Sequence, residues 1–354
     1  MPRTQDRLIM KWIFAFGSLA ILLVVYGGLV RLTRSGLSIV EWNPVGGAVP
    51  PLTQQAWDTE FSKYQGTPEY RQINRSMALE DYQRIFLIEW FHRLLARLAG
   101  LVFAIPFLIF LLGGRIPWKE STPYVLIGIL FISQALMGWL MVSSGLNERP
   151  AVSHYLLAAH LFLALSLIGL SAWTLLGHVY GFADGRRKVR WSSASRATLV
   201  ALAVLLVQIA YGAFTAGLKA GHVSKSWPLM LGRWIPQGLM SQTDPAVLSL
   251  VGAPLTVAFI HRWLAIAALI VAVIAYRTIG RSQLASDLTA GLRLVGALGV
   301  TQIGLGVAVV VSGVDIAVAL LHQFNAICLF IMSVYMLHRL RRRDRASLQA
   351  PPVN

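Results

Sequence analysis

Eight long apolar runs, each able to cross a lipid bilayer, dominate this chain of 354 residues. A transmembrane helix needs about 20 consecutive, mostly apolar residues. The runs lie at 10–30, 86–113, 121–142, 152–177, 196–216, 254–276, 290–311 and 316–338. Only 13% of the residues are charged, against about 25% in soluble domains. The first run is too long for a signal peptide and lacks a small-residue cleavage pattern. We therefore predict an all-α integral membrane protein with eight transmembrane helices.

The positions of Lys and Arg predict the orientation of these helices. Most of them lie at the two termini and in the loops after the second, fourth and sixth runs, and Arg341-Arg342-Arg343 ends the last run. Both termini are therefore predicted to be cytoplasmic. The net charge of +16 marks the cytoplasmic side, so nucleic-acid binding is not expected.

The chain also repeats itself, which predicts two similar halves. Tyr26-Gly27 matches Tyr211-Gly212 and Trp42 matches Trp227 at an offset of 185 residues; His92-Arg93 matches His261-Arg262 at 169; Gln134 and Gly138 match Gln302 and Gly306 at 168. Four spans per repeat let both copies enter the membrane in the same direction. We predict two four-helix bundles related by a pseudo-twofold axis along the membrane normal, with an N-terminal half at 1–185 and a C-terminal half at 186–354.

Two outer loops differ from the short connections elsewhere. Residues 32–85 and 217–253 are aromatic and mixed in charge, unlike disordered linkers. Long loops in compact proteins are usually functional. Both are predicted to form structured caps, the first with short helices around 53–64 and 78–85.

Four histidines lie at one depth in alternate spans. His92, His160, His261 and His322 are each seven to nine residues from the outer end of spans 2, 4, 6 and 8, which places their rings about 10–13 Å deep. Paired imidazoles on facing helices of a bundle can ligate both axial positions of a haem iron. The pattern therefore predicts two bis-histidine sites, although a packing role for such residues is the alternative.

Other ligands and metals fit this pattern less well. His154 lies only about two residues into its span and about 120° around the helix from His160, so His160 is preferred. Zinc is disfavoured because two histidines per bundle leave it under-ligated. The single cysteine, Cys328, allows neither a disulfide framework nor a cysteine-based metal site.

Charged residues accompany the first histidine. Glu89 lies one helical turn before His92, near the membrane boundary, and Ala258 stands at that position in the second repeat. Glu89 is either a functional carboxylate or an interfacial acid paired with Arg93. Arg93 and Arg262 directly follow a predicted ligand, and they meet either haem propionates or lipid headgroups.

Several motifs occur in a distinctive order along nearly the whole chain. They are Gly28 to Trp42 (GLVRLTRSGLSIVEW), Glu89-Trp-Phe-His92-Arg93, Gln134-Ala-Leu-Met-Gly138, Pro150 to Leu161 (PAVSHYLLAAHL), Gly217-Leu-Lys-Ala-Gly221, Trp227-Pro228, His261-Arg262 and His322-Gln323. Together they resemble the haem A synthase family over roughly residues 10–340. Some members carry cysteine pairs in the outer loops. This chain has none there and is similar to the cysteine-poor branch of proteobacteria and mitochondria.

The resemblance implies an oxidoreductase of haem biosynthesis. It would oxidise the C8 methyl group of haem O to a formyl group by successive hydroxylations, giving haem A for terminal oxidases. By the same resemblance, His261 and His322 hold a haem b cofactor and His92 and His160 face the haem O substrate. Glu89 stands at the position of the family's functional carboxylate and is expected to accept a proton or orient a water.

The resemblance also implies a location and partners. The expected location is the bacterial inner membrane, with haem O handed over from a membrane haem O synthase and the product passed to oxidase assembly. The oligomeric state is left open. The sequence alone also leaves open a non-enzymatic di-haem cytochrome or haem carrier. A secondary transporter is disfavoured, because transporters place ionisable groups near the membrane midplane and these spans are apolar there.

Overall fold

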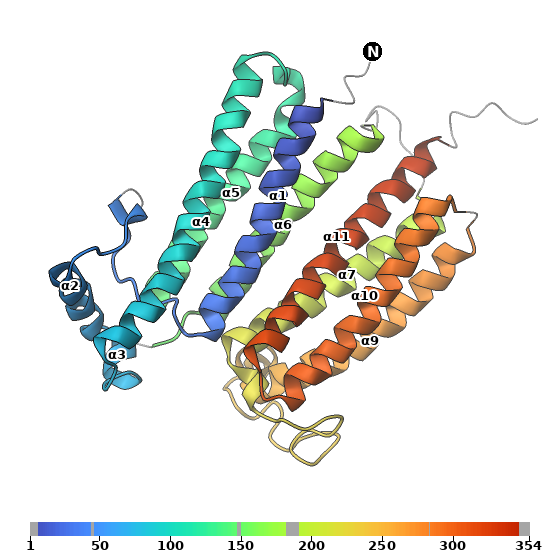
Figure 1. The fold of residues 1–354 in the computed structure, drawn as a ribbon. Coiled ribbons are helices and arrows are strands. Elements are labelled where there is room, and N and C mark those ends of the chain that lie inside the picture. The colour runs from blue at the N-terminus through green and yellow to red at the C-terminus, as the bar shows by residue number, and fades with distance from the viewer. Residues whose placement is uncertain (1–5, 44–45, 147–149, 182–190, 283, 347–354) are drawn as a thin grey trace, which may run out of the picture. The chain divides into compact units, whose positions relative to one another are not determined.

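Eight long apolar helices form the framework of the protein, as predicted (Figure 1). The computed structural model describes residues 6–43, 46–146, 150–181, 191–282 and 284–346. The long helices are α1 (Arg7–Leu32), α4 (Leu79–Leu112), α5 (Thr122–Leu146), α6 (His154–Tyr180), α7 (Ser193–Gly217), α9 (Pro254–Gly280), α10 (Ser286–Val311) and α11 (Ile316–Ala346). A helix pairs its own backbone polar groups, which is what a lipid environment requires. The chain is therefore an integral membrane protein.

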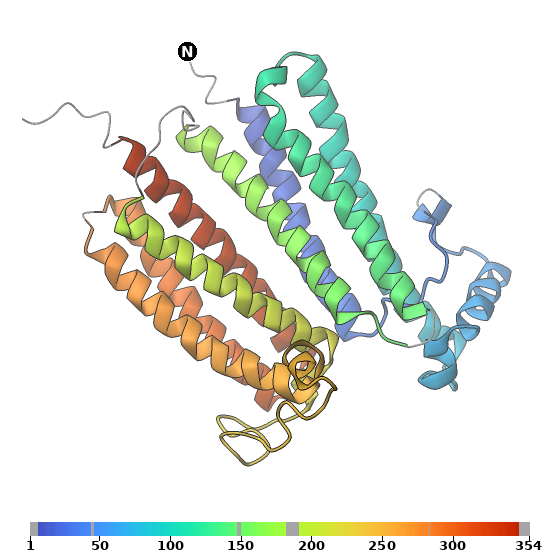
Figure 2. The same cartoon turned by 180° about the vertical axis from the view of Figure 1, so that it is seen from behind.

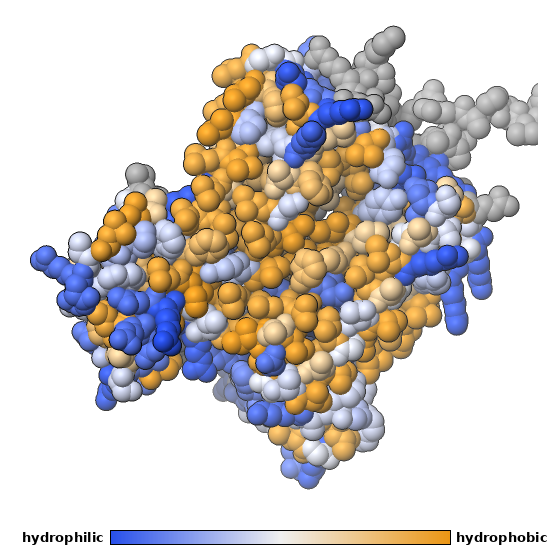
Figure 3. Space-filling model, in the orientation of Figure 1, coloured by the Kyte–Doolittle hydropathy of each residue, from blue (hydrophilic) through white to orange (hydrophobic). Residues whose placement is uncertain are grey.

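The outer surface of these helices is apolar. Large hydrophobic side chains such as Leu101, Ile129, Ile270 and Val300 are exposed along them, and hydrophobic residues cover the sides of the helices in Figure 3. Hydrophilic residues gather at the helix ends and over the loops in the same view. This distribution fits helices whose sides face lipid.

One compact unit comprises Ala15–Leu167. Phe16 of α1 is buried, with its ring 4.9 Å from that of Phe103 on α4 and 5.7 Å from that of Phe131 on α5. A Cβ atom on Gly100 would lie 3.2 Å from the Phe131 ring, and one on Gly128 would lie 3.1 Å from the Phe103 ring. These glycines let α4 and α5 approach closely, as small residues do between membrane helices.

The other compact unit comprises Met1–Phe14 and Ile168–Asn354. It holds α7, α9, α10 and α11, which Figure 2 shows from behind. Asp344 near the end of α11 accepts hydrogen bonds from the backbone N–H of Ser192 (3.1 Å) and the hydroxyl of Ser195 (2.7 Å), and so caps the start of α7. The boundary at residue 185 and the pseudo-twofold axis stay predictions.

The first outer loop folds into a helical cap beside the start of α4. It contains α2 (Gln54–Gln65), close to the predicted helix at 53–64, and α3 (Pro68–Gln72). The separate helix predicted around 78–85 is wrong, because these residues form the first turns of α4. At 34 residues, α4 is about 51 Å long. It therefore projects beyond a hydrocarbon core of about 30 Å.

Aromatic side chains hold this cap together. Tyr64 and Tyr82 are fully buried, and their rings stack 5.0 Å apart. The ring of Phe61 lies 5.1 Å from that of Tyr82. Asn74 donates a hydrogen bond of 2.7 Å to the Tyr64 hydroxyl. The first turns of α4 are therefore part of the core of the cap.

The second outer loop forms a cap of short elements. They are the 3₁₀ turns η3 (Ala220–His222) and η4 (Ala246–Leu248) and the single turn α8 (Ser249–Gly252). Met230 is buried against Ala220, Leu255 and Ala258, and forms an isolated bridge with Arg233. Both predicted caps are therefore structured. The first contains helices, and the second contains only short turns among its described residues.

The buried Tyr64 hydroxyl gives the first cap a predicted pH dependence. Desolvation raises the pKa of Tyr64, aided by the charge of Glu69 and opposed by the hydrogen bond from Asn74. The neutral hydroxyl therefore stabilises the cap fully below about pH 10, the value in an unfolded chain. This stability is lost as the pH rises through the higher folded pKa. Thermal unfolding followed by near-ultraviolet circular dichroism between pH 8 and 12 measures the effect.

Tyr64→Phe is the matched control, since it keeps the ring and removes the titrating group. We expect the wild-type cap to lose stability above pH 10 more steeply than this variant. Identical pH profiles would contradict the role given to Tyr64.

Candidate functional site

The structure brings the four histidines together as two pairs. His92 on α4 interacts electrostatically with His160 on α6, and His261 on α9 interacts with His322 on α11. Each pair lies within one compact unit. Among the described residues, no group of three or more His, Cys, Asp or Glu side chains is arranged to hold a metal ion. Each of the two histidine pairs offers two imidazoles as candidate ligands.

Each of the four rings lies over a glycine of a neighbouring helix. A Cβ atom on the glycine would lie 3.2–3.4 Å from the ring in every case. The pairs are His92 with Gly27, His160 with Gly138, His261 with Gly212, and His322 with Gly306. The glycines occupy matching positions of the two repeats, so both halves seat their histidines in the same way.

His154 does not share this arrangement. It is the first residue of α6, and its ring lies 3.9 Å from that of the adjacent Tyr155. His160, six residues further along the helix, is the one that interacts with His92. The geometry therefore supports the choice of His160.

The histidine pairs fit the axial coordination of a haem iron. Neutral imidazole is a common haem ligand, and bundle proteins build such sites from facing helices. Nδ1 of His160 is buried and has no hydrogen-bond partner among the described residues, a costly state that a bound group at this site relieves. The glycines beneath the rings make room for the imidazoles themselves, because a Cβ atom there would lie only 3.2–3.4 Å from the ring.

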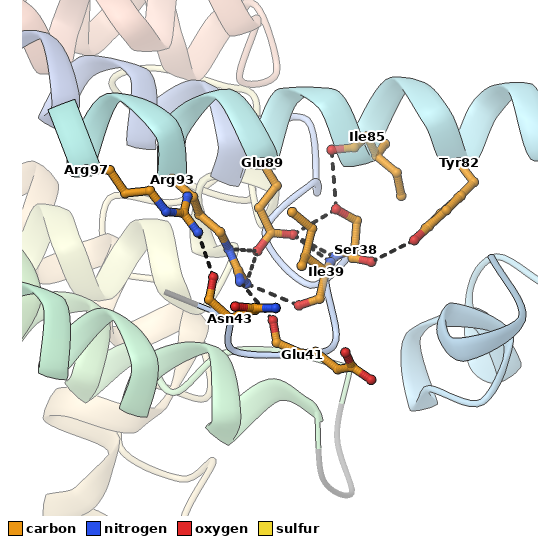
Figure 4. A network of polar contacts seen from close by, with 9 residues as sticks. All are labelled: Ser38, Ile39, Glu41, Asn43, Tyr82, Ile85, Glu89, Arg93 and Arg97. Atoms are coloured by element: carbon orange, nitrogen blue, oxygen red, sulfur yellow. Dashed lines mark hydrogen bonds and ion pairs between the residues drawn. The ribbon is translucent and has the colours of Figure 1, made fainter. Parts of the chain in front are cut away.

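Glu89 is the centre of a dense polar network (Figure 4). Its side chain is buried, and its Oε2 accepts hydrogen bonds from the N–H of Ser38 (2.9 Å), the hydroxyl of Ser38 (2.7 Å) and the N–H of Ile39 (2.9 Å). Its Oε1 accepts from Nε (3.1 Å) and Nη2 (2.6 Å) of Arg93. Both oxygens are satisfied, so Glu89 joins α4 to the segment that follows α1. The ion pair with Arg93, which the sequence suggested as the alternative to a functional carboxylate, is present.

The arginines that follow His92 and His261 bind the outer loops. Each guanidinium donates to two backbone carbonyls that are two residues apart. Arg93 donates to Ile39 (3.1 Å) and Glu41 (3.3 Å), and Arg262 donates to Ser224 (2.7 Å) and Ser226 (2.9 Å). Both acceptor pairs are related by the offset of 185 residues found in the sequence. This contact was not predicted from the sequence, although the loop and the His-Arg pair both recur in the second repeat.

The backbone of the two loops is also matched. Arg34 and Lys219, again 185 residues apart, both adopt a left-handed conformation with φ of 56° and 54°. Such a conformation is uncommon for residues other than glycine. The two halves therefore leave α1 and α7 by the same turn and present the same carbonyls to the arginine.

The contact between helix and outer loop beside the arginine is polar in the first half and apolar in the second. Ala258 stands at the position of Glu89 in the second repeat. It is buried in an apolar cluster with Leu255, and Val223 packs against this cluster. Val223 itself stands at the position of Ser38. The two substitutions together replace a carboxylate and its hydroxyl partner by apolar contact. Of the two matched positions, only the one in the N-terminal half has a carboxylate.

The Glu89–Arg93 pair gives a stability prediction. Arg93→Ala leaves a buried carboxylate without its charged partner, which costs about 3–5 kcal/mol. Removing Glu89 as well relieves this penalty, so we expect the double variant Glu89→Ala/Arg93→Ala to lose less than the sum of the single variants. Chemical unfolding in detergent micelles measures the coupling energy.

The Glu60–Lys63 pair of the first cap is the control. It is partly exposed, with an N–O distance of 2.7 Å, and exposed pairs contribute about 0–1 kcal/mol. A coupling energy for Glu89–Arg93 no larger than this would show that the network does not hold the loop.

Known proteins similar to this chain identify its family. The family model COX15-CtaA, cytochrome oxidase assembly protein, matches residues 10–334. Relatives named "Heme A synthase" include those of Sphingopyxis alaskensis, 39% identical over 94% of this chain and 92% of the relative, and Paramagnetospirillum magneticum, 38% identical over 94% and 93%. The relative of that name from Wolbachia pipientis subsp. Culex pipiens is 40% identical over 94% and 97%. The chain therefore belongs to the haem A synthase family of cytochrome oxidase assembly proteins.

Proposed function

We propose that this protein is a haem A synthase, a membrane oxidoreductase that converts the C8 methyl group of haem O to a formyl group by successive hydroxylations. The observation that carries the proposal is the histidine pair His92 and His160, in the same unit as the buried carboxylate Glu89. Relatives named "Heme A synthase" that align over nearly the whole chain support the same activity.

The two histidine pairs have different roles in this proposal. His261 and His322 hold a resident haem b, and His92 and His160 take haem O as substrate. Haem iron, when bound, supplies the redox chemistry. The protein would supply the imidazoles that hold the haem, position the methyl group and take up the released protons. Glu89 is present only in the first half, which supports placing the reaction there.

Arg93 and Arg262 connect the helices that carry the histidines to the outer loops. Both hold an outer loop through its carbonyls, directly after a proposed ligand. A guanidinium has five N–H donors, and the loop carbonyls take two of those of Arg262. We propose that the remaining N–H groups of Arg262 donate charge-assisted hydrogen bonds to a haem propionate.

Glu89 is the proposed proton acceptor. Its carboxylate lies one turn before His92 and is bonded to the hydroxyl of Ser38 at 2.7 Å. A hydroxyl can rotate and act as donor or acceptor, so Ser38 can turn its lone pair toward Glu89 when that residue takes up a proton. General base catalysis of this kind contributes about 10²–10⁴-fold to a rate.

The proposed setting is the bacterial inner membrane, with both termini in the cytoplasm. The bias of Lys and Arg toward the termini and alternate loops supports this orientation. It places the two caps and the histidine pairs near the outer side. Haem O would come from a membrane haem O synthase and haem A would pass to the assembly of terminal oxidases.

Glu89→Gln tests the role of the carboxylate. The amide keeps the size of the side chain and removes the proton acceptor, so we expect haem binding to persist and haem A formation to fall by about 100-fold or more. Chromatography of haems extracted from cells that also make haem O measures the product. Asp58→Asn, at an exposed acid of the first cap, is the control. Wild-type haem A yield from Glu89→Gln would remove Glu89 from the mechanism.

Single histidine variants test the assignment of the two pairs. We expect His261→Ala and His322→Ala to purify without their resident haem, because each removes one axial ligand. His160→Ala should keep that haem and lose conversion of haem O. Pyridine haemochrome spectra of the purified proteins give the haem content. Haem retained by His322→Ala and lost from His160→Ala would reverse the assignment of the two pairs. If the protein were instead a di-haem cytochrome, the wild type would contain two haems and yield no formylated product.

A further inference from the structure

An open apolar groove lies between α6, α10 and α11. Its volume is about 430 Å³, and all of its lining residues belong to the unit that holds Ile168–Asn354. Each of the three helices contributes aliphatic side chains to its walls, among them Leu175, Leu176, Leu294, Ile331 and Met332. Leu294 is exposed on α10, so the groove opens onto the apolar surface of the helices.

One end of this groove is polar. Asp287, in the first turn of α10, accepts hydrogen bonds from the hydroxyl of Tyr335 (3.3 Å) and from Nη2 of Arg339 (2.6 Å) on α11. Cζ of Arg339 lies 3.8 Å from the centre of the Tyr180 ring, at the end of α6. Four polar side chains therefore join the three helices at the same end of the groove.

The change from apolar to basic is regular along α11. Ile331, Tyr335 and Arg339 are spaced by four residues and share one face of the helix. Arg342 follows three residues later on that face and reaches the end of α6, since a Cβ atom on Gly181 would lie 3.2 Å from its Nη2. Such a groove matches an amphiphile that has a long apolar chain and an acidic headgroup.

The charges at the polar end favour an anionic headgroup. Arg339 and Arg342 border this end, whereas Asp287 is the only acidic side chain among the described residues that line the groove. A guanidinium has five N–H donors, so Arg339 can bond Asp287 and a phosphate at the same time. This end of the helices is the one proposed to face the cytoplasm, where basic sites between membrane helices bind anionic lipid headgroups.

The polar end is not a common feature of the two repeats. Lys119 and Pro123 stand at the positions of Asp287 and Gly291 at the offset of 168 residues. A Cβ atom on Gly291 would lie 3.0 Å from the ring of Tyr335, so the glycine lets this ring lie against α10. The second half therefore carries both the acidic residue and the space for the tyrosine.

We propose that this groove binds one anionic phospholipid. Its acyl chain lies along Leu176, Leu294 and Ile331, and its phosphate accepts hydrogen bonds from Arg339 and Arg342. The bound lipid holds the ends of α6, α10 and α11 together. The inference is independent of the proposed haem chemistry, because no histidine takes part in the site.

The test is the binding of dioleoyl phosphatidylglycerol to the purified, delipidated protein in detergent, measured by native mass spectrometry. Dioleoyl phosphatidylcholine, which has the same chains and a headgroup without net charge, is the comparison. We expect one phosphatidylglycerol to bind at least about 5-fold more tightly than phosphatidylcholine, the effect of one arginine near an anionic headgroup. Equal affinities for the two lipids would overturn the inference, since a neutral amphiphile or the bulk bilayer would then fill the groove.

Two charge variants change this affinity in opposite directions. Arg339→Gln should weaken binding of phosphatidylglycerol about 5-fold. Asp287→Asn should strengthen it, because the amide oxygen still accepts from Tyr335 and the negative charge beside the phosphate is gone. Arg277→Gln, at an exposed arginine near the end of α9, is the control and should leave the affinity unchanged. Equal weakening by Arg339→Gln and Asp287→Asn would show that the ion pair matters only for the fold, and would overturn the inference.

A bulky side chain tests the groove itself. Ala290 lines the groove at an exposed position of α10, so Ala290→Trp fills it without disturbing buried contacts and should abolish the tight site. Ala297→Trp is the matched control, since Ala297 is also exposed and lies two turns further along the same face of α10. Circular dichroism checks that both variants fold. Tight phosphatidylglycerol binding retained by Ala290→Trp would contradict the proposed site.

Discussion

A polar group inside a bilayer has no water to bond, and this constraint shapes the whole protein. It demands helices that satisfy their own backbone, and it demands a partner for every buried polar side chain. The rings of His92, His261 and His322 meet it with hydrogen bonds to the backbone of Leu23, Gln208 and Gln302. Glu89 meets it with five hydrogen bonds, and Arg262 meets it with two loop carbonyls. Nδ1 of His160 is buried without a partner among the described residues, which supports the proposal that a ligand binds beside it.

The two halves keep one architecture and differ in a few polar residues. Both contain a left-handed residue after their first helix, Arg34 or Lys219. In both, an arginine donates hydrogen bonds to carbonyls of the outer loop. The first half adds Glu89, where the second has Ala258. The second half adds Gln208, where the first has Leu23. The proposed reaction is assigned to the first half because only that half carries a carboxylate at the matched position of Glu89.

The spans could be predicted from the sequence because membrane helices are marked by length and apolarity alone. The same pattern missed the start of α4, since Tyr82 and Phe86 belong to the cap and not to lipid. The histidine pairing could be anticipated because depth in a helix follows from residue count. The loop contacts of Arg93 and Arg262 could not be anticipated, because a long side chain can reach several partners and the sequence does not say which one is near.

By itself the sequence determined an eight-span membrane protein with two repeats, a family, and four histidines at one depth. These properties depend on composition, spacing and order along the chain. Only the tertiary structure decided that Glu89 bonds Ser38 and Ile39, 51 and 50 residues away, and that Arg93 and Arg262 each bond two carbonyls of an outer loop. Such contacts join segments far apart in the chain, so their geometry depends on how helices pack and which way each side chain turns.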